Sequence, residues 1–455
     1  MNTKLLTVLA LADTMLASSG DLDSLVAACA RVFDADLPWA PAICTALIER
    51  TGEHFHYFSR HELADILLAL LGHRFSDDDE DADSDLDALP DPIILPPVRR
   101  YCIDAPIVPP APAWRSVLDL PELPSSGALA LWLNVPVGEL AWFADRWRLA
   151  GESETPLQHY HYRWLPKRSG GVRLIEVPKS RLRHLQQRIL RGILDRVPAH
   201  PAAHGFVHGR SCVTHAALHA GQRAVLRMDL KDFFPGIEHA RIHALFETLG
   251  YPAAVAGALS RLCVNRTPRG AFGPGQAGAS LPWAERQPFK SPHLPQGSPC
   301  SPALANLCAW RLDVRLESLA QSMAARYSRY ADDLVFSGGD RFARAADRFH
   351  VRVAAIALEE GFTVNTRKTR LMRQGTRQQV TGVVVNRHPN IARPDYEQLK
   401  AILCNCLRHG PASQNRAGRA DFRAWLAGRI SFVRMVNPAR GRKLQLLAND
   451  IDWAL

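Results

Sequence analysis

The sequence lacks several features that mark common protein classes. It contains no run of about 18 or more apolar residues, which is the length that a helix needs to cross a bilayer. Its nine cysteines include no Cys-x-x-Cys pair, so the usual spacings of zinc and thioredoxin-like sites are missing. With 47% hydrophobic and 22% charged residues, the composition is neither fibrous nor wholly disordered. We therefore expect a cytoplasmic protein with reduced thiols and no membrane partner.

Basic residues are scarce in the first quarter of the chain and abundant afterwards. Residues 1–112 hold 7 Lys and Arg against 19 Asp and Glu, a net charge of −12. Because the whole chain carries +10, with 55 basic and 45 acidic residues, residues 113–455 hold 48 basic and 26 acidic residues, or +22. Such an excess is typical of proteins that bind polyanions. The larger part is therefore expected to bind nucleic acid, and the first part is not.

Four segments are predicted along the chain. Residues 1–75 show short amphipathic helical patterns, whereas 76–112 begin with an acidic run and continue with many prolines, the composition of a solvated linker. Residues 113–394 alternate β patterns with helical ones, and 395–455 are helical and rich in arginine. The predicted fold class is α+β with an extra N-terminal α-helical domain. Docking of an effector protein and a stabilising cap both remain open as roles for that domain.

Two acidic clusters lie beside predicted strands. Asp229 directly follows the apolar run Ala224–Met228, and Asp332 and Asp333 form a tight turn between two β segments. Asp is unfavourable in strands, and burying its charge is costly without a partner. Carboxylates on neighbouring strand ends can hold two Mg²⁺ ions about 3.5–4 Å apart for nucleotidyl transfer. The alternative is a set of turn residues that bind nearby backbone groups.

The order of the motifs resembles that of reverse transcriptases, and within them the retron type. Tyr330–Asp333 is similar to the YxDD motif of the family, and Asp229–Phe234 to the segment with its first catalytic Asp. Further segments resemble the PQGxxxSPxLxN motif, the motif that follows YxDD, and the VTG segment at the start of the thumb; these are Pro295–Asn306, Gly361–Thr369 and Val380–Gly382. The resemblance implies a right-hand polymerase fold in which 113–394 form fingers and palm and 395–455 form the thumb.

This resemblance implies roles for individual residues. Asp229, Asp332 and Asp333 would be catalytic and would hold two Mg²⁺ ions. Phe234 would exclude a ribose 2′-hydroxyl, unless it is only a core residue of the palm. The remaining residues implied near the nucleotide are Lys167, Arg168, Arg173, Gln296, Gly297 and Lys368. Lys167, Arg168 and Arg173 lie on the hairpin that the resemblance assigns to the fingers, and the alternative is that this hairpin is only a solvated basic one. For Lys368 the resemblance implies a role as general acid towards pyrophosphate.

Recognition of RNA is the second role that the resemblance implies. Val213–His219 occupies the place of the retron NAxxH segment, with His215 instead of Asn. His215 and His219 are thus candidate RNA contacts, or else a helix face packed on the palm. Among the arginines of the predicted thumb, Arg423 and Arg429 are the candidates for RNA contact, because their charge can neutralise phosphates. The Gly- and Pro-rich loop 268–293 contacts RNA or is a tolerated surface insertion.

The expected function is RNA-directed DNA synthesis of the retron type. The enzyme would use dNTPs to make a small DNA from a structured noncoding RNA, in the setting of antiphage defence, with an effector protein as a further candidate partner. A group II intron-like, diversity-generating or CRISPR-associated reverse transcriptase is the alternative within the same class. A non-catalytic RNA-binding scaffold or antitoxin is the alternative from a different class.

Overall fold

The computed structural model describes residues 3–18, 20–52, 55, 58, 60–72, 96–99, 117–145, 157–167 and 170–453. The chain divides into two compact units. The first comprises residues 1–142 and 246–259, and the second comprises 143–245 and 260–455. The acidic run of the predicted linker and most of its Pro-rich stretch lie outside the described residues. The predicted boundaries at 75/76 and 112/113 fall there too.

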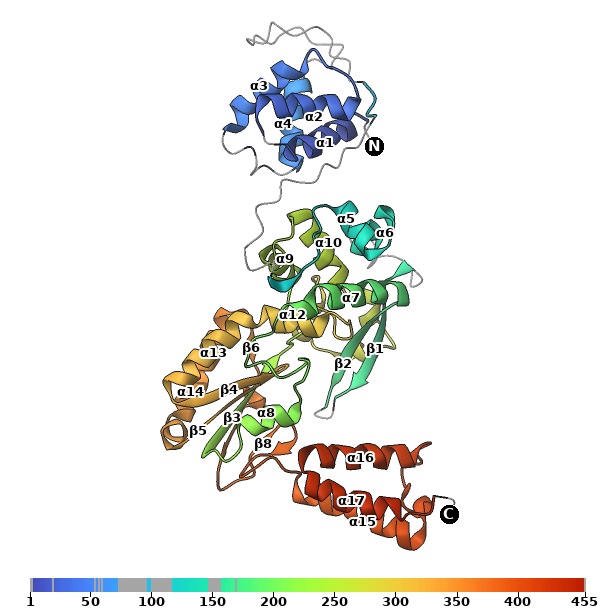
Figure 1. The fold of residues 1–455 in the computed structure, drawn as a ribbon, viewed down its shortest axis with the longest axis vertical. Coiled ribbons are helices and arrows are strands. Elements are labelled where there is room, and N and C mark those ends of the chain that lie inside the picture. Colours follow the sequence, from blue (N-terminus) through green and yellow to red (C-terminus); the bar gives the residue numbers. More distant parts are fainter. Residues whose placement is uncertain are drawn as a thin grey trace. The chain divides into compact units, whose positions relative to one another are not determined.

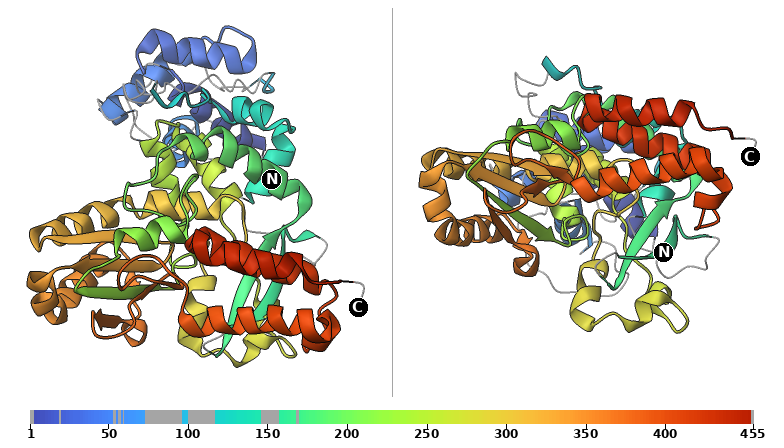
Figure 2. Two further views of the ribbon diagram at one scale, coloured as in Figure 1. Left: turned by 60° about the horizontal axis from the view of Figure 1, so that its bottom comes forward. Right: turned by 90° about the horizontal axis from the view of Figure 1, so that it is seen from below.

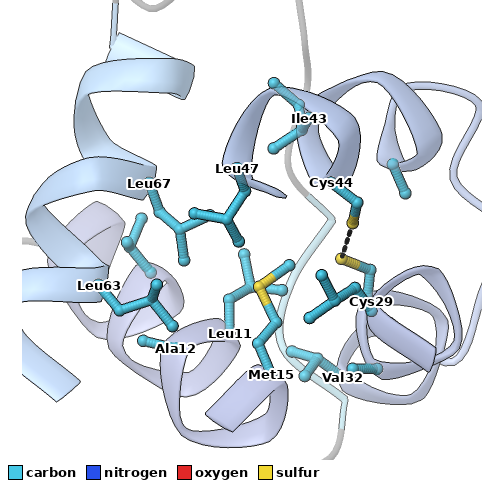
Figure 3. Packing of buried hydrophobic residues seen from close by; sticks show 14 of the residues in the cluster. Leu11, Ala12, Met15, Cys29, Val32, Ile43, Cys44, Leu47, Leu63 and Leu67 are labelled. Carbon is cyan, nitrogen blue, oxygen red and sulfur yellow. Dashed lines mark hydrogen bonds between the residues drawn. The ribbon is translucent and has the colours of Figure 1, made fainter. Parts of the chain in front are cut away.

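Four helices near the N-terminus enclose a hydrophobic core of their own. They are α1 (Thr3–Leu16), α2 (Leu22–Phe33), α3 (Ala40–Thr51) and α4 (Arg60–Gly72). Asp21 caps α2 as its sequence position predicts, because its carboxylate accepts a hydrogen bond from Ser24 N at 3.0 Å. Figure 3 shows the packed side chains, which include Leu11, Met15, Val32, Ile43, Leu47, Leu63 and Leu67.

The remaining helices of the first unit are short and apolar. A bend of 95° separates α5 (Ser126–Leu133) from α6 (Val137–Ala144), at the Pro136 break that the sequence predicts. Most of α10 (Ala253–Cys263) also belongs to this unit. Among the described residues no single helix is both long and apolar enough for a membrane span, and α5 with α6 reaches that threshold only as a bent pair.

In the second unit a β-hairpin precedes a basic amphipathic helix. Strands β1 (Tyr160–Pro166) and β2 (Val172–Pro178) pair antiparallel, joined by a turn in which Gly170 and Gly171 have φ of 87° and 76°. Glycine suits this turn because it adopts positive φ without steric cost. Helix α7 (Ser180–Gly192) follows and buries its apolar side. The sequence pattern predicts a hairpin over 160–177, which is confirmed, and a helix over 180–196, of which the structure forms α7 and then the short 3-10 turn η4 (Leu194–Arg196).

The central sheet has the strand order β4-β5-β3-β6, with β7 also paired to β3. Its strands are β3 (Ala224–Lys231), β4 (Ala325–Tyr330), β5 (Asp333–Gly338), β6 (Thr363–Val364) and β7 (Arg370–Arg373). Helices α13 (Trp310–Ser322) and α14 (Asp340–Glu359) lie along this sheet in Figure 1, and α8 (Cys212–Leu218) contacts β4. The strand β3 is buried over most of its length, so it is an apolar run rather than an alternating one.

One predicted helix is broken. The sequence pattern favours a single helix over 303–319, whereas the structure has α12 (Ser301–Cys308) and then α13. The break lies at Ala309, which has a φ of −85° and a ψ of 2°. Its backbone N–H donates to Ala305 O and Leu307 O, and α12 ends there. The sequence pattern also predicts a helix over 241–249, and helix α9 (His239–Thr248) agrees with that span within two residues at each end.

The predicted surface loop 268–293 has short turns of its own. They are η5 (Arg269–Phe272), η6 (Ala277–Ser280), α11 (Trp283–Arg286) and η7 (Gln287–Phe289). The loop packs on the β1–β2 hairpin, because Trp164 Nε1 in β1 donates to Ala271 O at 3.0 Å. A Cβ on Gly278 would lie 2.1 Å from the Trp164 ring, so only glycine fits beside this indole.

Three helices form the C-terminal part. After the small hairpin of β8 (Gln379–Val380) and β9 (Val383–Val384) come α15 (Arg393–His409), α16 (Phe422–Val436) and α17 (Pro438–Asn449). Figure 2 shows these helices side by side. They share one hydrophobic cluster with residues of β3, β5 and the small hairpin. The predicted thumb segment 395–455 thus starts two residues inside a helix that begins at Arg393.

Candidate active site

The strand register brings the three predicted catalytic carboxylates to one edge of the sheet. Asp229 at the end of β3 is paired directly with Asp333 at the start of β5. The β4–β5 hairpin pairs Tyr330 with Asp333, so Ala331 and Asp332 form its turn. Leu230 N donates to Asp332 O at 2.9 Å and thereby ties the turn to β3. The tight turn between two strands is confirmed, and it places the acids side by side.

A fully buried arginine supports this turn from beneath. Arg329 Nη1 donates to Ala331 O at 3.1 Å and to Asn306 Oδ1 at 3.0 Å, while its Nη2 donates to Asp313 Oδ2 at 2.6 Å. Asn306 Nδ2 in turn donates to Gly205 O at 2.9 Å. A Cβ on Gly205 would lie 2.5 Å from Ala331 N, so glycine lets the two backbones meet. This network stabilises the left-handed φ of 56° at Ala331.

Sequence reasoning did not assign Arg329 or Asp313 to the site. A signal was present, because an arginine inside the β pattern Ala325–Tyr330 must be paired if it is buried. Its partner Asp313 lies on α13, and only the folded chain brings the two together.

Two cations compensate the acidic edge. Lys368 Nζ donates to Asp229 Oδ1 at 2.8 Å. Arg227 Nη2 donates to both carboxylate oxygens of Asp333, at 2.8 and 2.7 Å, and its Nε adds a third bond at 3.0 Å. Lys368 is a predicted site residue, whereas Arg227 was not assigned. Its position two residues before Asp229 puts both side chains on one face of β3.

Asp332 is the carboxylate with the least compensation. Burial, together with the charges of Asp229 and Asp333, raises the pKa of Asp332 to about 6. Burial also raises the pKa of Asp333, although the Arg227 guanidinium opposes this. The edge therefore concentrates negative charge that the protein itself only partly neutralises, which is the electrostatic setting of a cation site.

The donor set fits a hard divalent cation. In the described part of the chain, no three His, Cys, Asp or Glu side chains are already arranged as a metal-binding group. Lys368 and Arg227 hold Asp229 and Asp333 instead. Three carboxylates on adjacent strand ends nevertheless supply the oxygen ligands that Mg²⁺ prefers. A bound cation would compete with Lys368 for Asp229.

The predicted nucleotide segment lies against the fingers hairpin. Glu176 N in β2 donates to Gln296 O at 2.9 Å. Gly297 has φ of 138°, and a Cβ there would lie 2.7 Å from Glu176 O. Ser301 Oγ donates to Pro295 O at 2.6 Å and closes the segment onto α12. Gln296 and Gly297 are thus held by backbone contacts between β2 and the start of α12.

The two described fingers cations are both exposed. Lys167 lies at the hairpin turn, where its N–H donates to Gly171 O at 3.0 Å, and Arg173 lies on β2 opposite Leu165. Both side chains are exposed, so their charge is available to an anion. Arg168 lies outside the described residues.

Phe234 is half-buried in an aromatic group beside the catalytic turn. Its ring centroid lies 5.5 Å from that of Phe233 and 6.1 Å from that of Phe206. Phe206 is 52% exposed and lies 6.5 Å from Tyr330. Phe234 is therefore only partly buried, and its aromatic group reaches solvent at Phe206 beside Tyr330. Sequence reasoning did not find Phe206.

The predicted RNA contact of His215 and His219 is wrong for the folded chain, because both side chains are fully buried. His219 bridges two strands through bonds to Ser337 Oγ at 2.7 Å and Ser328 Oγ at 2.6 Å. Burial lowers the pKa of His215 to about 3 and holds that of His219 well below its usual range. The alternative, a helix face packed on the palm, is the one that the geometry supports.

The predicted thumb arginines are exposed and lie over indole rings. The Arg423 guanidinium is 5.4 Å from the Trp453 ring centroid, and that of Arg429 is 5.9 Å from Trp425. Arg419 also lies over Trp425, at 4.7 Å from its ring centroid. Arginine above an aromatic ring is an arrangement that also suits stacking of nucleobases.

Comparisons with known proteins identify the family of this chain. Residues 165–385 match the family described as reverse transcriptase (RNA-dependent DNA polymerase). The chain is 38% identical over 344 residues to the retron Mx65 reverse transcriptase of Myxococcus xanthus, an alignment that covers 73% of this chain and 71% of the relative. This chain belongs to the retron reverse transcriptases.

Other retron reverse transcriptases are similar over comparable lengths. The retron Mx162 enzyme of Myxococcus xanthus is 37% identical over 347 residues, which cover 73% of this chain and 68% of the relative. The retron Ec86 enzyme of Escherichia coli is 28% identical over 276 residues, covering 60% and 74%. The protein is thus an RNA-directed DNA polymerase of retron type with a right-hand polymerase fold, and the intron-like and scaffold alternatives are set aside.

Proposed function

We propose that this retron reverse transcriptase joins dNTPs to a primer at Asp229, Asp332 and Asp333. The convergence of these three carboxylates at one sheet edge is the observation that carries the proposal. Two Mg²⁺ ions bound there would supply Lewis-acid activation of the primer hydroxyl and charge stabilisation of the leaving pyrophosphate. The raised pKa of Asp332 supports a site that gains free energy when a cation binds.

The cations around this edge orient the acids and the triphosphate. Arg227 holds both oxygens of Asp333 in one plane, and a bidentate contact of this kind fixes the carboxylate rotamer. Lys368, released from Asp229 when a cation takes its place, would remain beside the leaving phosphates. Lys167 and Arg173, exposed on the fingers hairpin, would bind the triphosphate oxygens.

Phe234, Gln296 and Gly297 would shape the nucleotide pocket. The half-buried Phe234 ring stands five residues after Asp229, where it would contact the sugar and reject a 2′-hydroxyl by steric clash. Gln296 and Gly297, fixed against β2, would border the base and the template. Glycine lets the backbone approach the nucleotide without interference from a side chain.

We further propose that the thumb binds a structured noncoding RNA that serves as template and primer for a small DNA. Arg423 and Arg429, exposed beside Trp453 and Trp425, would contact phosphates and unstacked bases. The net charge of +22 over residues 113–455 would make this binding strongly dependent on salt. A cytoplasmic role in antiphage defence with an effector protein is part of the same proposal.

Sequencing of the nucleic acid that copurifies with the full chain tests this function. The protein would be expressed together with the RNA encoded beside its gene. A DNA strand complementary to part of that RNA, resistant to RNase and digested by DNase, is the expected product. Recovery of RNA alone, with dNTPs freely available in the cell, would contradict the proposed synthesis.

A further inference from the structure

Glu176 is a buried carboxylate of the fingers hairpin to which no role has been assigned so far. Its side chain has no exposed surface. Oε1 accepts hydrogen bonds from Asn265 Nδ2 at 2.8 Å and Thr267 Oγ1 at 2.7 Å, and Oε2 accepts one from His293 Nε2 at 2.9 Å. A buried carboxylate is tolerated only when it is paired and hydrogen-bonded in this way.

His293 carries the compensating charge. Its Nδ1 lies 2.8 Å from Ser291 O, which can only accept, and its Nε2 faces the Glu176 carboxylate. A ring that donates from both nitrogens is an imidazolium. Burial alone would lower the pKa of His293, but the charge and hydrogen bond of Glu176 reverse this and raise it. Tyr160 and Tyr162 are the other titratable groups that face Glu176.

The carboxylate closes the base of the 268–293 loop. Asn265 and His293 exchange two backbone hydrogen bonds of 3.0 Å, and Thr267 N donates to Phe289 O at 3.2 Å. Asn265, Thr267 and His293 are the three partners of Glu176, so one side chain binds both the segment that enters the loop and the segment that leaves it. The loop is therefore fastened to the fingers rather than loosely inserted.

The backbone of the same residue holds the nucleotide segment. Glu176 N donates to Gln296 O at 2.9 Å, and the close approach of Gly297 is to Glu176 O. His293, bound to the Glu176 side chain, lies only three residues before Gln296. A change at the carboxylate is therefore transmitted to Gln296 along both the main chain of β2 and the segment 293–296.

We propose that Glu176 and His293 form a positioning pair that sets the place of Gln296 and Gly297 for the incoming dNTP. The inference rests on the proposed nucleotide role of Gln296 and Gly297. Neither member of the pair touches substrate; the pair acts through the segment it fixes. A misplacement of about 1 Å in such a segment is enough to weaken binding in the productive geometry.

Kinetics of Glu176→Gln in the full chain test the pair. This substitution keeps the shape of the side chain and removes the charge that balances His293. We expect KM for dNTP to rise about tenfold while kcat changes much less, since the catalytic carboxylates are untouched. The second variant, Glu176→Gln with His293→Gln, removes the unbalanced imidazolium and should recover part of the loss, as coupled residues do.

A buried amide elsewhere in the same unit provides the matched control. Gln378 is also fully buried, and its Nε2 donates to Gln222 O at 3.0 Å and Met372 O at 3.2 Å. Gln378→Leu should lower Tm without changing KM for dNTP. If Glu176→Gln behaves in the same way, with lower Tm and unchanged KM, the pair is only structural and the proposal is overturned.

Hydrogen exchange separates this proposal from the proposed function. Amide exchange in residues 293–298 should accelerate in Glu176→Gln and not in Gln378→Leu, whether or not dNTPs are incorporated. Accelerated exchange in a protein without any polymerase activity would refute the function and keep the structural coupling. Unchanged exchange at 293–298 would overturn the pair regardless of activity.

Discussion

At the residue scale, the central feature is a set of acids held by two cations. Asp229 and Asp333 face each other across adjacent strands, and Arg227 lies diagonally opposite Asp333 on the same face as Asp229. In this arrangement Arg227 and Lys368 balance two of the three carboxylates. Asp332 at the turn is left with the largest electrostatic penalty, which a cation would relieve.

The raised pKa of Asp332 predicts how the metal-free protein responds to pH. A carboxyl whose pKa rises from 3.8 to about 6 on folding favours the folded state while it stays protonated. That contribution is complete below about pH 4 and is lost as pH rises through about 6. In buffer with chelator at pH 7, Asp332→Asn should therefore be more stable than wild type by on the order of 2 kcal/mol. Denaturant titration at pH 4 and pH 7 measures this.

A stability difference that does not change with pH would contradict this prediction. If Asp332→Asn and wild type differ by the same amount at both pH values, the side chain is not strained by its neighbours in the fold. Mg²⁺ should then also fail to stabilise the wild-type protein selectively.

Phe234 gives a prediction about the choice of sugar. Phe234→Ala should raise incorporation of ribonucleotides relative to deoxyribonucleotides by roughly 10- to 100-fold, because the ring that would meet a 2′-hydroxyl is removed. Single-nucleotide extension with each nucleotide measures the ratio. Phe432→Ala, on an exposed thumb aromatic, is the control and should leave the ratio unchanged. An unchanged ratio in Phe234→Ala would make Phe234 a packing residue only.

At the scale of elements, local patterns predicted most of the fold. The β1–β2 hairpin follows from Gly170-Gly171 between alternating segments, and the Ala331-Asp332 turn follows from two β runs that flank it, although the sequence places Asp333 in the turn and the structure places it in β5. The break between α12 and α13 was not predictable, since Ala309 is a good helix former and tertiary contacts decide there. The burial of His219 depends on Ser328 and Ser337, which accept or donate its two ring hydrogen bonds and lie more than 100 residues away along the chain.

The same limit applies to the site. Asp229, Asp332 and Asp333 could be predicted because each ends or interrupts an apolar β run and because their motifs resemble those of reverse transcriptases. Arg227 was missed, because a charged residue within a strand pattern gives no sign of its partner across the sheet. The Glu176 network was missed because its partners lie at the two ends of a loop that the sequence presents as a surface insertion.

The thumb helices predict a salt-dependent interface. Arg423→Ala with Arg429→Ala should weaken binding of the cognate RNA and reduce the slope of log K against log salt by about 1–2, since each arginine would neutralise about one phosphate. Filter binding across a salt series measures the slope. Arg352→Ala with Arg348→Ala, on α14 of the palm, removes the same charge. Equal effects of the two double variants would show a general charge effect and no thumb interface.

At the scale of the whole molecule, helices α1–α4 have a hydrophobic cluster separate from that of the C-terminal helices, and residues 1–112 and 113–455 carry opposite net charge. Among the described residues, the core of α1–α4 consists of residues within this helical group and Val98, so we expect its stability not to depend on the polymerase core. The acidic run that follows lies outside the described residues, and the basic excess belongs to residues 113–455. This separation suits a polymerase with an added module that does not itself bind nucleic acid.

Truncation of a core side chain tests the independence of the N-terminal helices. Leu47 is fully buried in their cluster, and Leu47→Ala should destabilise that cluster by about 2–5 kcal/mol. Calorimetry of the full chain should show one transition moved to lower temperature and another unchanged, with dNTP incorporation retained at the assay temperature. A single transition that shifts as a whole would contradict independent cores.

The most direct test of the central claim is dNTP incorporation on an RNA template with Mg²⁺ by wild type, Asp332→Asn and the double variant Asp332→Asn with Asp333→Asn. Loss of one preorganised charged group in a polar catalytic site typically costs about 10²–10³ in rate. We predict a loss of at least this size in Asp332→Asn and no measurable extension by the double variant, with both proteins folded and still bound to RNA. Incorporation by the double variant at the wild-type rate would contradict the account.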